Sequence, residues 1–364
     1  MIRFNELGRE YADLKPDIDA ALSRVMARGH FILGPEVERF ENEFAAYIGM
    51  SQGIGVNSGT DALYLSLLAA GIGSGDEVIV PVNTALPTAM AVLMSGAKPV
   101  FVDCDERYLM DLDGVPDAVT ERTKAIIPVH LYGAACDLER IRALADTHDL
   151  DLIEDCAQAA GAAWRGVKVG TVGDYAAFSF YPTKTLGAYG DGGMILVNDP
   201  AKAAELRALR FYGEPDRTRS ERFGVNSRLD ELQAAILSAK LAYLDRWNAR
   251  RREIAGRYDM LLKGADCVLP ESPEENGHAY HLYVIRVKGR DAVRKRLAEK
   301  GIETLVHYPL PLHRHPVFSE WSTYSFPRAE AYAREILSLP LHPYLTDDEA
   351  AGIAEAVRSV LSSS

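Results

Sequence analysis

Short apolar runs alternate with helical stretches between about Gly53 and Val197. This alternation predicts strands at 54–56, 77–80, 99–103, 125–130 and 152–155, and helices at 60–70, 88–95 and 138–147. Two further apolar runs, 175–180 and 194–197, flank a glycine-rich loop and are also predicted strands. Strands that alternate with helices form βαβ units and a mostly parallel sheet. Antiparallel pairing of the last two strands would make that sheet mixed.

The pattern changes in the last third of the chain. A long helix is predicted from Asp230 to Arg257, because its apolar residues follow helical spacing. Strands at 281–287 and 303–307 follow, with helices at 291–300, 328–337 and 346–361. We therefore expect an α/β protein with a large domain at 1–245, which begins with a helical segment, and a smaller α+β domain at 246–364.

Composition narrows the function classes. The chain has 364 residues, 48% of them hydrophobic, and a formal net charge of -12. An acidic chain does not favour nucleic acid or an anionic membrane as its partner. The four cysteines form no CxxC pair and have no metal-ligand spacing, so we expect reduced thiols and no metal. No signal-peptide pattern or bilayer-length apolar run is present, and we expect a cytoplasmic protein.

An anion site is predicted where the first strand meets its helix. The segment Val56-Asn-Ser-Gly-Thr60-Asp-Ala-Leu ends a strand and opens a helix, whose exposed N–H groups and positive end attract a phosphate. Ser58 and Thr60 could add hydroxyl donors. Simple N-capping by either residue is the alternative. The segment is neither GxGxxG nor a Walker sequence, so it does not indicate a dinucleotide or nucleoside triphosphate.

A second candidate is the acid that ends the strand at 152–155. Ligands of α/β proteins bind at the carboxyl ends of strands, so Asp155 could hold a protonated ring nitrogen there. Its alternative interpretation is an aspartate that opens a turn. Asn226 and Ser227 precede the long predicted helix, where capping is again the alternative.

The most informative residue is Lys184, which follows Ser179-Phe-Tyr-Pro-Thr at the end of a predicted strand. Burial lowers the pKa of a lysine and frees its amine as the nucleophile that Schiff-base chemistry requires. Ser179 could bind the same phosphate as Thr60. Four glycines let the backbone pass close to a ligand: Gly187, Gly190, Gly192 and Gly193. For a lone lysine, a solvated surface loop is the commoner interpretation.

Together these motifs resemble a known family. The chain looks like a DegT-type nucleotide-sugar aminotransferase, in the aspartate-aminotransferase fold (fold type I of the pyridoxal-phosphate enzymes). The resemblance covers nearly the whole chain. Its segments are Phe31-Ile-Leu-Gly-Pro-Glu-Val-Glu38, Ser58-Gly-Thr-Asp-Ala-Leu63, Gly71-Ile-Gly-Ser-Gly-Asp-Glu-Val78, Pro128-Val-His-Leu-Tyr-Gly133, Glu154-Asp-Cys-Ala-Gln158, the lysine segment, Asn226-Ser-Arg-Leu-Asp-Glu-Leu-Gln233, His307-Tyr-Pro-Leu-Pro-Leu-His313 and Ser338-Leu-Pro-Leu-His-Pro343.

The resemblance implies a large domain that binds pyridoxal 5′-phosphate. Lys184 matches the family's Schiff-base lysine and Asp155 the partner of the pyridinium nitrogen. Gln158 matches the residue near the ring hydroxyl. The phosphate contacts are implied for Gly59, Thr60, Ser179 and Asn226.

Asn226 matches a contact that the other subunit donates, so the resemblance implies a homodimer with shared active sites. His307, Tyr308 and His313 match sugar contacts; a proline-rich turn on the small domain is their alternative. Two positions depart from the family. Ala85 stands where an aromatic often stacks on the pyridine ring, and Ala160 stands where a histidine is common.

The implied activity is that of a transaminase. L-glutamate would donate the amino group, leaving 2-oxoglutarate, and Lys184 would act as general base while Asp155 stabilises the pyridinium. A nucleotide-linked keto-deoxysugar, first of all a dTDP-3-keto-6-deoxyhexose, would accept it with ping-pong kinetics.

Other activities within and beside this family stay open. They are amination of a 4-keto-sugar nucleotide, amination of a keto-inositol, and a regulatory protein that binds the cofactor without turnover. A sugar dehydratase of the same fold is rejected, because such relatives carry histidine at the position of Lys184.

Overall fold

A seven-stranded sheet forms the centre of the computed structural model, which describes residues 1–215, 218–271 and 277–362. The strand order is β1-β9-β8-β5-β4-β2-β3. β9 runs antiparallel to both of its neighbours, β1 and β8, and the other neighbouring strands are parallel. The mixed, mostly parallel sheet is therefore confirmed. Its strands are β1 (Gln52–Val56), β2 (Glu77–Pro81), β3 (Lys98–Val102), β4 (Thr123–Ile126), β5 (Asp151–Asp155), β8 (Tyr175–Ser179) and β9 (Gly193–Val197).

Apolar side chains cover both faces of this sheet. In β8, Tyr175 and Ala177 belong to one buried cluster, whereas Ala176 and Phe178 belong to another. This two-residue period places neighbouring side chains on opposite faces. A strand buried on both faces reads as a continuous apolar run, which explains why the sequence pattern located these strands well.

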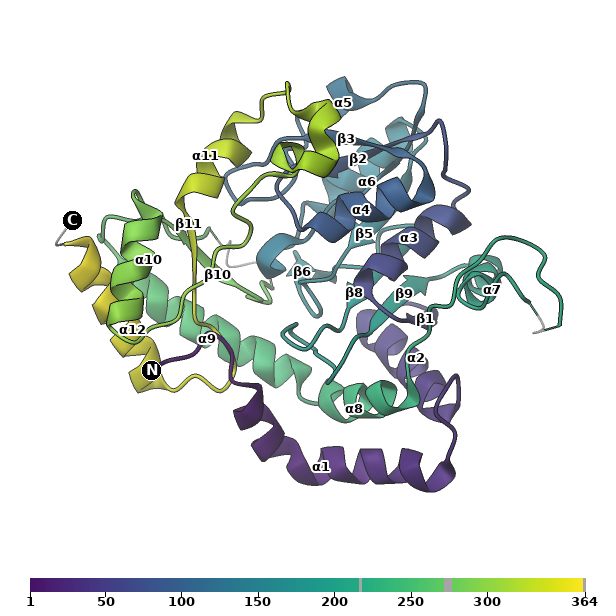
Figure 1. Cartoon of the computed structure of the whole chain (residues 1–364), viewed down its shortest axis with the longest axis horizontal. Coiled ribbons are helices and arrows are strands. Elements are labelled where there is room, and N and C mark those ends of the chain that lie inside the picture. Colours follow the sequence, from purple (N-terminus) through teal and green to yellow (C-terminus); the bar gives the residue numbers. More distant parts are fainter. Residues whose placement is uncertain (216–217, 272–276, 363–364) are drawn as a thin grey trace.

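Helices pack on the two faces (Figure 1). Five helices come between the strands of the sheet in the chain or follow the last of them. They are α3 (Gly59–Ala69), α4 (Leu86–Ser95), α5 (Val115–Ala118), α6 (Leu138–Thr147) and α7 (Pro200–Leu209). Helices α1 (Leu7–Arg28), α2 (Pro35–Ile48) and α8 (Glu231–Leu241) lie together beside the sheet. Phe44 of α2 packs edge-on against Phe178 and Phe180, which fixes the helix against the strand before the lysine loop.

The C-terminal part is built around a two-stranded antiparallel sheet of β10 (Tyr283–Arg286) and β11 (Ile336–Leu339). Its helices are α9 (Leu244–Leu262), α10 (Arg290–Glu299), α11 (Pro327–Glu335) and α12 (Asp347–Leu361). The short elements are β6 (Ala163–Trp164), β7 (Val167–Lys168) and 3-10 turns at Leu131–Gly133, Leu312–Arg314 and Pro316–Trp321. Figure 1 shows α10 and α12 far from the large sheet, whereas α9 runs back towards α8.

Several boundaries differ from those expected. The helix predicted at 230–257 is two helices, α8 and α9, with a break at Ala242 and Tyr243. No glycine or proline stands at that break, and the helical spacing of the apolar residues continues across it, so the sequence gives no sign of it. Residues 303–307 form no strand; only Leu305 makes an isolated bridge, to Ser338. The predicted strand 125–130 ends at Ile126, although Val129 bridges Asp155.

The helix predicted at 328–337 ends at Glu335, and the next four residues are a strand. Ile336–Leu339 pairs with Tyr283–Arg286, so tertiary pairing decides its conformation. The domain boundary at 245/246 stays a prediction. Residues beyond it also contribute to the core of the large sheet, since Phe318 and Trp321 pack edge-on against Phe101 of β3.

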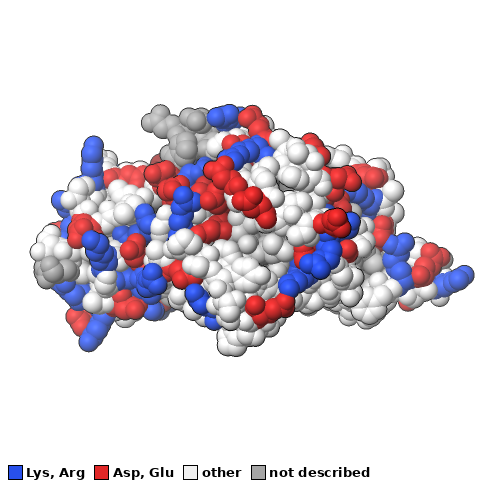
Figure 2. All heavy atoms as spheres, turned by 90° about the horizontal axis from the view of Figure 1, so that it is seen from above, with Lys and Arg blue, Asp and Glu red and all other residues white. Residues whose placement is uncertain are grey.

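The surface carries charges of both signs. On the face drawn in Figure 2, basic and acidic side chains are interspersed rather than gathered by sign. Within the described ranges, none of the helices has the length and apolar character needed to cross a bilayer.

Candidate active site

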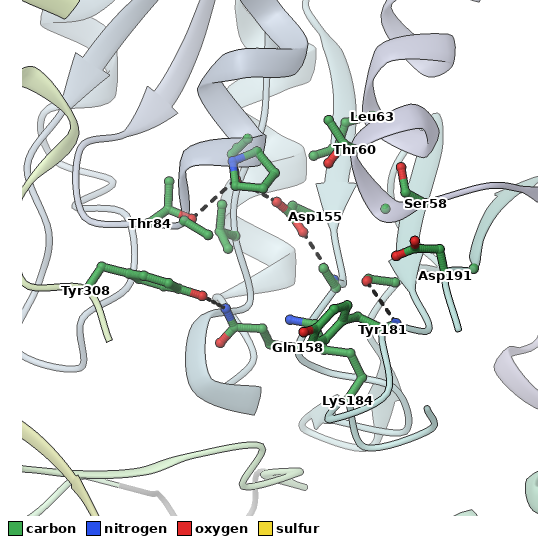
Figure 3. A pocket seen from close by; sticks show the side chains of 18 residues that line it. Ser58, Thr60, Leu63, Thr84, Asp155, Gln158, Tyr181, Lys184, Asp191 and Tyr308 are labelled. Atoms are coloured by element: carbon green, nitrogen blue, oxygen red, sulfur yellow. Dashed lines mark hydrogen bonds between the residues drawn. The ribbon is translucent and has the colours of Figure 1, made fainter. Parts of the chain in front are cut away.

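A cavity of about 330 Å³ opens at the carboxyl edge of the large sheet. The residues that follow β1, β2, β5 and β8 meet there, as the topology of parallel strands requires. Most of the candidates from the sequence line it: Gly59, Thr60, Asp155, Gln158, Ser179, Lys184 and Tyr308. Figure 3 shows the labelled members of this set surrounding one space.

The amino end of α3 closes one side of the cavity. Ser58 is the N-cap, and its side chain accepts a hydrogen bond from the Asp61 N–H at 3.1 Å, so the capping interpretation holds for this residue. A Cβ atom on Gly59 would lie 2.7 Å from the Cβ of Ser179. This close approach of α3 to the end of β8 requires glycine. The positive end of α3 makes this side of the cavity suited to an anion.

Lys184 reaches the cavity from the loop between β8 and β9. The loop turns tightly: a Cβ on Gly187 would lie 2.2 Å from the Pro182 carbonyl oxygen, and Ala188 N–H donates to the Phe180 carbonyl at 2.8 Å. The residue is half-buried, and its ammonium end points inward (Figure 3). Burial lowers the pKa of Lys184 to about 8, although the charge of Asp155 opposes that shift. Its amine is therefore available as a nucleophile near neutral pH.

Asp155 lies at the end of β5 and is only 4% exposed. Its Oδ2 accepts a hydrogen bond from Thr88 Oγ1 at 2.8 Å, and its Oδ1 accepts one from the Ala157 N–H at 3.1 Å. Burial raises its pKa; these two hydrogen bonds and the charge of Lys184 oppose that shift. The carboxyl group is held in one orientation, facing the cavity.

Gln158 links the sheet to the C-terminal part. Its Oε1 accepts from the Tyr132 N–H at 2.8 Å, and its Nε2 donates to the Tyr308 hydroxyl at 3.0 Å. The backbone donor fixes which end of the amide is oxygen. Tyr132 in turn donates its hydroxyl to the His307 carbonyl. A residue from the predicted small domain, Tyr308, is thereby brought into a cavity of the large sheet.

Three candidates do not line the cavity of this single chain. Asn226 is exposed at the base of the segment that joins α7 to α8. His307 places its Nδ1 2.9 Å from Ser338 Oγ. His313 is buried, and its Nε2 lies 3.1 Å from Glu330 Oε1. Their functional roles stay predictions.

The sequence did not single out several residues of the cavity: Thr84, Thr88, Tyr181 and Asp191. Thr84 and Thr88 follow β2, and their four-residue spacing at a predicted helix start was the available signal. Of the two departures from the family, Ala85 lines the cavity. Ala160 instead packs in a buried cluster, where its carbonyl accepts from Asn248.

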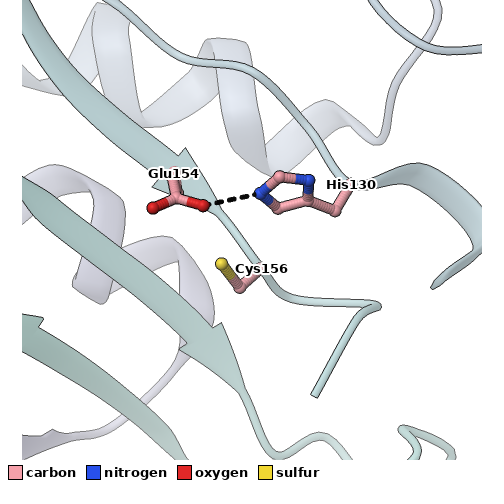
Figure 4. A group of neighbouring side chains, drawn as sticks. All are labelled: His130, Glu154 and Cys156. Atoms are coloured by element: carbon pink, nitrogen blue, oxygen red, sulfur yellow. Dashed lines mark hydrogen bonds and ion pairs between the residues drawn. The ribbon is translucent and has the colours of Figure 1, made fainter. Parts of the chain in front are cut away.

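A buried hydrogen-bond network includes the two residues that flank Asp155 in the chain. His130, Glu154 and Cys156 are fully buried and face one another (Figure 4). His130 Nδ1 accepts a hydrogen bond from the Cys136 N–H, so Nε2, which lies 3.0 Å from Glu154 Oε2, carries the ring proton. Glu154 also accepts the N–H groups of residues 170, 172 and 173. Burial would raise the pKa of Glu154, but these hydrogen bonds outweigh it and lower the pKa.

The comparisons with known proteins agree with this geometry. A model of the DegT/DnrJ/EryC1/StrS aminotransferase family matches residues 12–358. The chain belongs to this family. It is 48% identical over 358 residues to the dTDP-3-amino-3,6-dideoxy-alpha-D-galactopyranose transaminase of Aneurinibacillus thermoaerophilus, covering 98% of this chain and 99% of that protein.

Solved structures give the same result. The crystal structure of DesV from S. venezuelae superposes with a TM-score of 0.96 at 45% identity and covers 98% of each chain. NtdA from Bacillus subtilis, solved with bound cofactor PMP, has a TM-score of 0.91 at 34% identity and covers 96% of this chain and 82% of that one. The fold is therefore that of the type I pyridoxal-phosphate aminotransferases.

The cavity fits pyridoxal 5′-phosphate, the cofactor of this family. It offers an amine with a lowered pKa at Lys184, a buried carboxyl group at Asp155 and the amino end of α3 with Thr60 and Ser179. These three features suit an aldehyde, a ring nitrogen and a phosphate in turn. The donor set therefore matches the chemistry of the cofactor.

Proposed function

We propose that this protein transfers the amino group of L-glutamate to a nucleotide-linked keto-deoxysugar, with a dTDP-3-keto-6-deoxyhexose as its acceptor. One observation carries the proposal: Lys184 and Asp155 face the same cavity, which the amino end of α3 closes. The similarity to a transaminase named for a dTDP-3-amino-3,6-dideoxy sugar supports the acceptor.

The residues divide the work of a transaminase. The bound cofactor supplies an electron sink through its protonated ring nitrogen. Asp155 would hold that nitrogen protonated, and Thr60 and Ser179 would bind the phosphate. Lys184 would hold the cofactor, and its Nζ would also be the base that takes the α-proton of glutamate. Burial lowers the pKa of Lys184 to about 8, so part of its amine is unprotonated near neutral pH.

The sugar is proposed to bind on the side of the cavity bordered by Tyr308 and Ala85. The Tyr308 hydroxyl accepts a hydrogen bond from Gln158, so its own proton is directed to another acceptor. Ala85 leaves room where relatives of this family often carry an aromatic ring. His307 and His313 remain proposed sugar contacts. In this structure His307 Nδ1 lies near Ser338 Oγ, and His313 Nε2 lies near Glu330 Oε1.

A homodimer is proposed to complete each site. Asn226 does not line the cavity of its own chain, and it lies at the base of a segment with exposed apolar side chains. Tyr212 is 47% and Phe223 74% exposed there. A second copy would cover these side chains and receive Asn226 at its phosphate.

The four cysteines are unpaired, which supports the reducing cytoplasm as the location.

A panel of sugar nucleotides tests the acceptor. The holoenzyme is incubated with glutamate and with 3-keto or 4-keto deoxysugars on dTDP or UDP, and with a keto-inositol, and the aminated product is measured by mass spectrometry. We expect the dTDP-3-keto sugar to be used best, with parallel initial-rate lines for the two substrates. Exclusive use of a 4-keto sugar or of the inositol would refute the acceptor while leaving the aminotransferase intact.

A further inference from the structure

Asp155 receives a hydrogen bond from a neighbouring βα unit. Thr88 lies in the first turn of α4, and it is 1% exposed. Its Oγ1 is 2.8 Å from Asp155 Oδ2, which is the only side-chain hydrogen bond that the described residues give to this carboxyl group. The element that follows β2 thus holds a side chain at the end of β5.

A second threonine continues this contact. Thr84 Oγ1 lies 3.3 Å from Thr88 Oγ1, and the dashed lines between Thr84 and Asp155 in Figure 3 follow the path. An ionised carboxylate only accepts hydrogen bonds, so the Thr88 hydroxyl donates its one proton to Asp155 and accepts a hydrogen bond from Thr84. The hydroxyl dipoles then align towards the negative charge. A protonated Asp155 would donate instead and remove this order.

The surroundings of Asp155 make such a donor matter. Burial disfavours its charged form, and the titratable groups that face it come from three elements: Lys184 after β8, His130 after β4 and Tyr308 from the C-terminal part. Glu154 and Cys156 adjoin it in the chain. Lys184 would change its charge during turnover, whereas the Thr88 hydroxyl donates to Asp155 without taking part in the chemistry.

We propose that Thr88, supported by Thr84, is a positioning residue that keeps Asp155 ionised and in one orientation at the cofactor's ring nitrogen. The inference rests on the proposed function, because it needs pyridoxal phosphate in this cavity. It assigns to the start of α4 a role beyond lining the pocket. The two threonines act through Asp155.

Three variants test this role by cofactor binding. Thr88→Val keeps the volume and removes the hydroxyl, Thr88→Ser keeps the hydroxyl, and Thr84→Val removes only the supporting donor. Each apoprotein is titrated with pyridoxal 5′-phosphate, and the dissociation constant is read from the visible absorbance. We expect Thr88→Val to weaken binding roughly ten- to a hundredfold, as the loss of a hydrogen bond to a charged group predicts. Thr84→Val should weaken it less, and Thr88→Ser should stay near the wild type.

The pH dependence separates positioning from general damage. Without its Thr88 donor, Asp155 has a higher pKa and becomes neutral at a higher pH as the solution is acidified. The acid limb of cofactor binding should therefore move to higher pH in Thr88→Val and not in Thr88→Ser. Thr123→Val is the matched control. This buried threonine accepts a hydrogen bond from the Thr120 N–H at its Oγ1, at the end of the sheet opposite to the cavity. It should lower thermal stability and leave binding unchanged.

Each outcome decides the proposal. Wild-type affinity and pH profile in Thr88→Val would overturn it, as would equal losses in Thr88→Val and Thr88→Ser. If circular dichroism shows that Thr88→Val is unfolded, the Thr84→Val variant decides. Weaker cofactor binding by Thr84→Val supports the proposal, and unchanged cofactor binding overturns it. Failure of the wild type itself to bind the cofactor or to deaminate glutamate would instead refute the proposed function.

Discussion

Lys184 is a common type of residue in an unusual environment. Its side chain is half-buried, and burial lowers its pKa to about 8 from 10.5. Only the unprotonated amine attacks the aldehyde of the cofactor, and its fraction grows as pH rises through that value. The apoprotein should therefore capture pyridoxal phosphate at a rate that rises with pH and levels off above about 8. Stopped-flow absorbance measures this rate.

A free amine such as N-acetyl-lysine provides the control for titration of the cofactor itself. Its rate should continue to rise well above the pH at which the protein levels off. A midpoint for the protein that coincides with that of the free amine would contradict the burial argument.

At this scale, the sequence predicted two of the side chains that meet in the cavity. Asp155 and Lys184 stood at strand ends, and topology brought them into one cavity. Thr88 was missed, because a threonine in the first turn of a helix is an ordinary N-terminal residue. Its contact with Asp155 joins residues 67 apart in the chain, and only the order of the strands makes them neighbours.

At the scale of elements, buried carboxylates join segments that are distant in sequence. Glu231 of α8 is fully buried and accepts the N–H groups of Gly34, Glu36 and Val37 at the start of α2. The N–H groups of Gly34 and Val37 donate to its Oε1 at 2.9 and 2.8 Å, and that of Glu36 donates to its Oε2 at 3.1 Å. The carboxylate thus caps α2 from another helix, where no Ser, Thr, Asp or Asn precedes the helix.

Removing this cap should destabilise the protein. Glu231→Ala leaves three backbone donors without a partner, so we expect a loss of at least about 2 kcal/mol in the free energy of unfolding. Urea unfolding of the apoprotein, followed by circular dichroism, measures it. Glu38→Ala on the exposed side of α2 is the matched control and should cost less than about 1 kcal/mol. Equal losses in the two variants would contradict the capping role.

Elements were predicted well where they are buried on both sides and poorly where tertiary pairing decides. The strands beside Asp155 and Lys184 were found within a residue or two, because their apolar runs are continuous. Residues 336 and 337 were predicted as the end of a helix, because they continue the apolar pattern of α11. They belong instead to β11, and the pairing of β11 with β10 lies outside that pattern. The break at Tyr243 carries no local signal.

At the scale of the whole molecule, the proposed dimer predicts that two damaged subunits repair each other. Lys184→Ala removes the nucleophile of its own site, and Asn226→Ala removes the phosphate contact of the partner's site. A mixed dimer would hold one site with both residues intact. Random mixing should restore activity to about a quarter of the wild type, because half of the dimers are mixed.

Mixing after unfolding and refolding together, followed by a transamination assay, measures this recovery. The separately refolded variants, combined without exchange, are the control. Activity no greater than the sum of the two would contradict a site shared between subunits.

Transfer of nitrogen from glutamate to the sugar tests the central claim most directly. Holoenzyme is mixed with ¹⁵N-labelled L-glutamate and a dTDP-3-keto-6-deoxyhexose, and the product is analysed by mass spectrometry and NMR. The proposed function predicts ¹⁵N on carbon 3 of the sugar, 2-oxoglutarate in equal amount, and neither product with Lys184→Ala. A wild-type enzyme that binds the cofactor and leaves the label on glutamate would contradict it.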